Sequence, residues 1–227
     1  MISAFATAVA QLRDRRIIHI LILSLAVSAA VFVALWIGVG VLLANTTLFQ
    51  TGWLDNAIDV LGGLATVVIT WLLFPAVVSA TIGLFLENVA EEVERKHYPH
   101  LPAVRHQGMG EIIAITVKFL AIIVVLNIFM LVFLLFPPVF PFVFYGINGY
   151  LLGREYFELV GMRRLEPGSV TNMRRQHRLT VFVTGLVIAF LLTVPFVNLL
   201  APIIGTAAMV HVFERLRTSK GPSRPSA

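Results

Sequence analysis

The chain has 227 residues, of which 58% are hydrophobic and 13% charged, and its mean hydropathy is +0.90. Soluble domains carry about 25% charged residues, so this composition excludes a soluble globule and also a disordered chain. The absence of cysteine excludes disulfides, thiolate catalysis and cysteine metal sites. The composition predicts an integral membrane protein. We therefore assign the net charge of +5 to loops on the cytoplasmic side and not to binding of nucleic acid.

The first hydrophobic run, residues 17–44, contains no Asp, Glu, Lys or Arg. As a helix it is about 42 Å long, which exceeds the roughly 30 Å hydrocarbon core of a bilayer. We expect a retained transmembrane helix. A short amphipathic helix precedes it, with Phe5, Val9 and Leu12 on one apolar face.

A second run without charge lies between Asp59 and Glu87, with Pro75 inside it. The helical pattern continues beyond this run, because Val89 and Val93 fall on one face. The sequence therefore predicts a second long transmembrane helix that leaves the membrane and continues into water to about residue 98.

The third and fourth runs, residues 119–153 and 179–213, are each interrupted by prolines, which break helix interiors. The expected bends are at Pro137, Pro138, Pro141, Pro195 and Pro202. The expected helical pieces cover residues 119–136, 142–153, 179–194 and 203–213. The shorter pieces are only about 17–24 Å long, which is less than a bilayer core requires.

The charges of the linkers predict the topology. Linker 45–59 has two acids and no Lys or Arg, whereas the other linkers are basic, so only this linker is expected outside. Runs three and four must then enter and return on the cytoplasmic side. The predicted fold is an all-α integral membrane protein with two long transmembrane helices, two proline-bent half-penetrating hairpins, and interfacial and cytoplasmic helical extensions. Six full spans are the alternative.

Residues 1–217 are expected to form one helical membrane domain, and residues 218–227 a disordered basic tail. Backbone that bends within the bilayer must be shielded by protein or must line a water-filled cavity. One small chain cannot shield two such hairpins, so we expect a homo-oligomer in contact with membrane lipids.

No enzyme motif is present, so we expect neither catalysis nor a cofactor. His97, His100 and His106 lie in a loop with prolines that fixes no ligand geometry, and we expect no metal site.

Glu87, Glu91 and Glu94 share one helix face. This face is either a carboxylate site or, in the interpretation we favour, a solvated face on which Glu91 pairs with Arg95.

The basic residues suggest anion chemistry. Arg15 and Arg16 stand where the amphipathic segment meets the first span, either as an ordinary cytoplasmic anchor or as a pair that collects anions, because guanidinium groups bind tetrahedral oxyanions bidentately. The amino ends of broken membrane helices add partial positive charge. Candidate residues of a pathway or its rim are Glu87, Arg154, Glu155, Arg163 and Arg164.

Several motifs support a resemblance that covers about residues 3–217. They are Phe74-Pro75-x-Val77-x-Ser79, Gly149-Tyr150-Leu151-x-Gly153-Arg154, Arg163-Arg164 and Val194-Pro195-x-Val197-Asn198-Leu199. With these motifs the chain resembles the CysZ family of bacterial sulfate permeases, within the etoposide-induced-protein superfamily.

The resemblance implies a multi-pass oligomer of the bacterial inner membrane, with both termini cytoplasmic, that takes up sulfate for cysteine synthesis. It also implies that Arg15 and Arg16 bind sulfate. Asp14 precedes the pair, so a carboxylate lies beside the expected site. The alternative function is a non-transporting membrane scaffold or a lipid- or partner-binding protein, because basic linkers also bind anionic headgroups.

Overall fold

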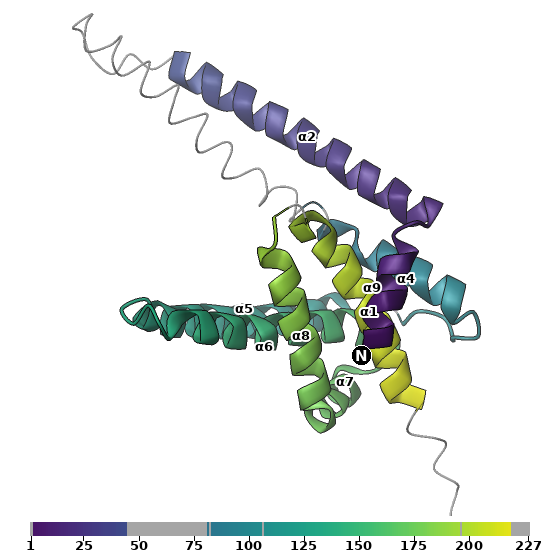
Figure 1. Ribbon diagram of the computed structural model, residues 1–227. Helices are drawn as coiled ribbons and strands as arrows, with labels where there is room; N and C mark the ends of the chain where they lie inside the picture. The colour runs from purple at the N-terminus through teal and green to yellow at the C-terminus, as the bar shows by residue number, and fades with distance from the viewer. Residues whose placement is uncertain (1, 45–80, 82, 106, 196, 219–227) are drawn as a thin grey trace, which may run out of the picture. The chain divides into compact units, whose positions relative to one another are not determined.

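The structure is a computed structural model that describes residues 2–44, 81, 83–105, 107–195 and 197–218 (Figure 1). All regular secondary structure within these residues is helical. They divide into two compact units, one with residues up to 14 and from 86 onward, and one with residues 15–85. Most of the second hydrophobic run, with Pro75, and most of the expected C-terminal tail lie outside the described residues.

In the smaller unit, α2 (Arg15–Ala44) is a single helix of 30 residues. It confirms the first long apolar helix and begins two residues earlier than the charge-free run. Ser24 donates a hydrogen bond to the carbonyl of Ile20 at 2.8 Å, and Ser28 donates to that of Ser24 at 2.7 Å. The hydroxyls in this apolar helix are thus satisfied within the helix, as a lipid environment requires.

The larger unit packs around its last helix. Its helices are α1 (Ile2–Gln11), α4 (Leu86–His97), α5 (Met109–Phe133), α6 (Phe140–Gly161), α7 (Pro167–Gln176), α8 (Arg178–Thr193) and α9 (Val197–Thr218). Helix α9 contacts α1, α4, α6 and α8 (Figure 1). The rings of Phe157 and Phe213, both fully buried, meet edge to face at 5.3 Å in this core.

Two pairs of neighbouring helices are joined by short proline-containing connections. Pro137 and Pro138 lie in the turn between α5 and α6, and Pro195 lies between α8 and α9. Pro141 belongs to the first turn of α6, where an amide N–H has no helical partner to lose. Pro202 lies inside α9, so the expectation that a helical piece begins only after this proline, at residue 203, is wrong. A proline near the start of a helix keeps a helical φ and removes a single hydrogen bond.

Helices α5, α6 and α9 extend beyond the pieces expected from the charge-free runs. Helix α5 begins ten residues before Phe119, and α6 continues eight residues past Gly153. Helix α9 starts six residues before Ile203 and ends at Thr218. Helices α6 and α9 have 22 residues each and are therefore longer than the expected pieces 142–153 and 203–213, because backbone hydrogen bonds continue past charged side chains. Of these two helices, α9 is also apolar enough to cross a membrane.

Helices α6 and α8 cross (Figure 1), and glycines from both helices lie at the contact. A Cβ on Gly153 would lie 2.5 Å from the carbonyl oxygen of Val181, and a Cβ on Gly185 would overlap the backbone of Gly149 and Gly153. Gly149 and Gly153 are four residues apart and face the same neighbour. This small-xxx-small pattern lets membrane helices approach backbone to backbone.

Three described helices, α2, α5 and α9, are long and apolar enough to cross a membrane. Helices α7 and α8 form a fourth candidate if the pair, bent by 89°, is treated as one broken span. Helix α5 buries no residue within the protein, whereas most of α9 is buried. The chain is a membrane-embedded, all-α protein.

Helix α1 packs on α9 through small side chains. Its buried residues are Ala4, Ala8 and Gln11, whereas Val9, on the predicted apolar face, is 51% exposed. The face that contacts protein therefore differs from the one that periodicity predicts, since alanines allow the close approach to α9.

Candidate functional site

Arg15 and Arg16 are the first two residues of α2, and both are exposed. They belong to the smaller unit, whereas Glu87, Arg154, Glu155, Arg163 and Arg164 belong to the larger one. Asp14 pairs with Lys96 of α4 at 2.8 Å. The carboxylate beside the arginine pair is thus paired with a lysine of another helix.

The acids of α4 do not share one environment. Glu87 in the first turn and Glu91 are exposed, whereas Glu94 is 3% exposed. Arg95 pairs with Glu92 at 2.6 Å. The predicted Glu91–Arg95 pair is wrong, because Glu92 offers its carboxylate one turn before Arg95. The three acids therefore form neither a carboxylate site nor a common solvated face.

Glu94 is the centre of a buried ionic triad with Arg163 and Arg164. Nη2 of Arg163 and Nη2 of Arg164 lie 3.1 and 2.6 Å from Oε2 of Glu94. Arg164 also donates through Nη1 to the carbonyl of Pro102. Arg163 and Arg164, expected at the rim of a pathway, instead hold α4 against the end of α6. This position predicts a mainly structural role for both arginines.

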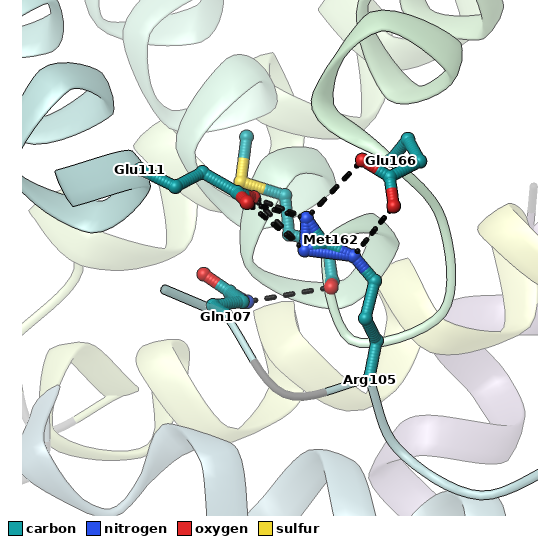
Figure 2. A network of polar contacts seen from close by, with 5 residues as sticks. All are labelled: Arg105, Gln107, Glu111, Met162 and Glu166. Carbon is teal, nitrogen blue, oxygen red and sulfur yellow. Dashed lines mark hydrogen bonds and ion pairs between the residues drawn. The ribbon is translucent and has the colours of Figure 1, made fainter. Parts of the chain in front are cut away.

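A second network fixes the segment between α4 and α5 (Figure 2). The guanidinium of Arg105 donates to both carboxylate oxygens of Glu111, with Nη2–Oε2 at 2.6 Å and Nη1–Oε1 at 3.0 Å, and its Nε lies 3.3 Å from Glu166. Gln107 donates to the carbonyl of Met162 at 3.3 Å. These contacts tie the start of α5 to the α6–α7 connection (Figure 2).

His211 of α9 joins two other segments. Its Nε2 lies 3.0 Å from Nε2 of Gln11, and its Nδ1 lies 2.9 Å from the hydroxyl of Tyr98. The ring of His97 packs edge-on at 5.1 Å. Partial burial and the neighbouring charge of Lys96 lower the pKa of His97. Among the residues that the structure describes, no group of three metal-ligating side chains is placed to hold an ion.

Arg154 lies in a basic region of the larger unit. It is 5% exposed, its Nε donates to Glu158 at 2.8 Å, and its guanidinium lies 5.0 Å from the ring centre of Phe119. With Arg174, Arg175 and Arg178 it lines a pocket of about 470 Å³. Glu155, the next residue on α6, is exposed and does not line this pocket.

Several residues of these networks were not candidates in the sequence. The basic linker contains Arg174, Arg175 and Arg178, and no pattern in the sequence indicates that they lie near Arg154. Glu94 differs from Glu87 and Glu91 only through its partners, which are 69 and 70 residues away along the chain. Charge alone marks these residues as basic or acidic, and their pairing depends on how α4, α6 and α7 pack.

Comparison with known proteins identifies the relationship of the chain. The family described as Sulfate transporter CysZ/Etoposide-induced protein 2.4 matches residues 4–202. A comparison with curated proteins found no match. The family is one of transporters and not of enzymes.

Proposed function

We propose that this chain, which belongs to the Sulfate transporter CysZ/Etoposide-induced protein 2.4 family, is a permease for sulfate or a similar oxyanion. The family match over residues 4–202 is the observation that carries the proposal. The apolar helices α2, α5 and α9 support a membrane location. No ionisable side chain interrupts the apolar part of α2 except His19, which favours passive permeation over a proton relay.

The proposed site is the pair Arg15 and Arg16, which begins α2. Two adjacent guanidinium groups at the amino end of a helix combine bidentate donors with the positive end of the helix dipole. Both side chains are exposed and thus accessible to a dissolved anion. In a bacterial inner membrane, uptake through such a protein supplies sulfate for cysteine synthesis.

Flux into liposomes tests the function and the pair separately. We expect purified protein to admit radiolabelled sulfate, and Arg15→Ala/Arg16→Ala to slow the flux by at least about tenfold, because two charge-assisted contacts are removed. Arg13→Ala/Arg95→Ala is the matched control, since it removes two other exposed arginines. Flux no greater than in empty liposomes contradicts the permease. An undiminished rate in the Arg15→Ala/Arg16→Ala variant retains the permease and rejects the pair as its site.

We further propose that both helical hairpins enter the membrane from the cytoplasmic side without crossing it. From Arg154 to Pro137, and from Arg178 to Pro195, the helices extend about 25 Å, which is less than the roughly 30 Å hydrocarbon core. The α5/α6 hairpin also lies across α8 (Figure 1). Crossing hairpins cannot both stand along the membrane normal, which supports partial insertion. Shielding of their turns is the reason to expect an oligomer.

The chain has no cysteine, so single cysteines report topology directly. We expect Leu135→Cys and Thr193→Cys, at the hairpin turns, to resist an impermeant maleimide added outside the cell. Thr51→Cys in the acidic linker is expected to react, and exposed Gly168→Cys to react only after permeabilisation. Labelling of residue 135 or 193 from outside the intact cell contradicts partial insertion.

A further inference from the structure

We propose a second oxyanion site where α6, α7 and α8 meet, formed by residues other than Arg15 and Arg16. The pocket there has a volume of about 470 Å³. It is lined by Tyr150, Arg154, Arg174, Arg175, Arg178 and Val181, among others. The ligand is a tetrahedral oxyanion, either free sulfate or the phosphate of an anionic lipid. The site depends on geometry within the larger unit and not on the permease function.

The charges around the pocket are unbalanced. Glu158 is the acid paired with this cluster, with Oε1 at 2.8 Å from Nε of Arg154 and 3.5 Å from Nε of Arg174. Arg175 and Arg178 form no ion pair with any residue that the structure describes. Four guanidinium groups and one carboxylate leave three positive charges close together. A divalent oxyanion relieves this repulsion and accepts several hydrogen bonds at once.

The fold concentrates these cations at one point. Arg174 and Arg175 lie in the last turn of α7, and Arg178 is the first residue of α8. The axes of these two helices are bent by 89°. The first N–H groups of α8 have no helical acceptor, so its amino end favours an anion. The buried Nε atom of Arg174 forms a long ion pair with Oε1 of Glu158 at 3.5 Å but makes no hydrogen bond within the described chain. Buried donors usually have a hydrogen-bond acceptor, and an anion in the pocket would supply one.

The arginines differ in how firmly they are held. Arg154 is buried and contacts both Glu158 and the ring of Phe119, which fixes the position of its guanidinium. Arg175 and Arg178, which also line the pocket, are exposed. One immobilised guanidinium and two accessible ones suit capture of an anion from solution or from the membrane surface. The exposed pair is also the one whose replacement leaves the core intact.

Binding to the full-length protein in detergent tests this site without transport. We expect Arg175→Gln/Arg178→Gln, made in the Arg15→Ala/Arg16→Ala background, to weaken binding of radiolabelled sulfate by at least about tenfold. The matched control in that background is Arg95→Gln/Lys96→Gln, two side chains about half exposed on α4. Arg175→Lys/Arg178→Lys keeps the charge but loses bidentate donors, and we expect an intermediate affinity.

A second arm distinguishes the source of the oxyanion. The same variants are placed in nanodiscs of phosphatidylglycerol or phosphatidylcholine, and retained lipid is measured after extraction. A selective loss of phosphatidylglycerol from Arg175→Gln/Arg178→Gln, without a change in sulfate binding, supports the site and identifies lipid phosphate as its ligand. Equal retention of sulfate and of both lipids by this variant and by its control overturns the proposal. Absence of sulfate flux in liposomes leaves these binding results unaffected, so the two proposals fail separately.

Discussion

Replacing Gly185 with alanine is expected to destabilise the larger unit by about 3 kcal/mol or more, because overpacking of a tight contact costs about 1–3 kcal/mol and backbone cannot rotate aside as a side chain does. The new Cβ would overlap the carbonyl oxygen of Gly149 and the amide nitrogen of Gly153. Helices α6 and α8 must then separate along their length. Thermal unfolding in detergent, followed by circular dichroism, measures the loss.

Gly146→Ala is the matched control for this variant. Gly146 also lies in a helix, α6, but a Cβ added there meets no atom within 4 Å. Alanine is favoured over glycine in a helix by about 1 kcal/mol, so this variant is expected to be at least as stable as the parent. If Gly185→Ala unfolds at the same temperature as Gly146→Ala, the close crossing of α6 and α8 is not the contact that stabilises this unit.

Replacing Glu94 with glutamine is expected to cost about 3–5 kcal/mol, the range for a buried ion pair that loses one partner. Glutamine keeps the shape of the side chain but leaves the guanidinium groups of Arg163 and Arg164 without their anion. Both arginine side chains are only 7% exposed, so water cannot replace the carboxylate. The free energy of unfolding in a denaturant series, with the protein in detergent, measures the effect.

Two further variants separate charge from packing. Glu91→Gln, on the exposed side of the same helix, is expected to change stability by less than about 0.5 kcal/mol. The triple variant Glu94→Met/Arg163→Met/Arg164→Met removes all three charges, and apolar replacement of a buried ionic group is often neutral. A triple variant as unstable as Glu94→Gln indicates that shape, and not the unpaired charge, accounts for the loss.

The sequence predicts helices well and their ends poorly. Residues 86–97 form a helix with Val89 and Val93 buried, as their spacing indicates. Helix α5, however, includes Glu111 and Lys118, which the charge-free criterion excluded. Charged residues indicate the depth in the membrane at which side chains reach water. A helix ends where its backbone hydrogen bonds end, and this position need not coincide with the first charged residue.

The ion-pair partners of a charged residue are harder to predict from the sequence than the helices are. Arg163 and Arg164 are adjacent arginines, which in the sequence suggest an anion-binding rim. In the structure both contact Glu94, which is distant in the sequence. Arg154 is also an arginine near the end of an apolar run, but it lines a basic pocket. No local pattern separates the two cases, because the difference is whether a carboxylate from another helix reaches the guanidinium.

By itself, the sequence determined the membrane class, the all-helical fold and the proline-containing turns near residues 137 and 195, because apolar runs and prolines act locally on the backbone. The tertiary structure alone decided which glycines meet, which arginines are neutralised and where positive charge accumulates. These properties depend on distances between helices far apart in the chain. An excess of lysine and arginine over acids first appeared as a net charge of +5. In the folded larger unit, part of that excess gathers in a single pocket between α6, α7 and α8.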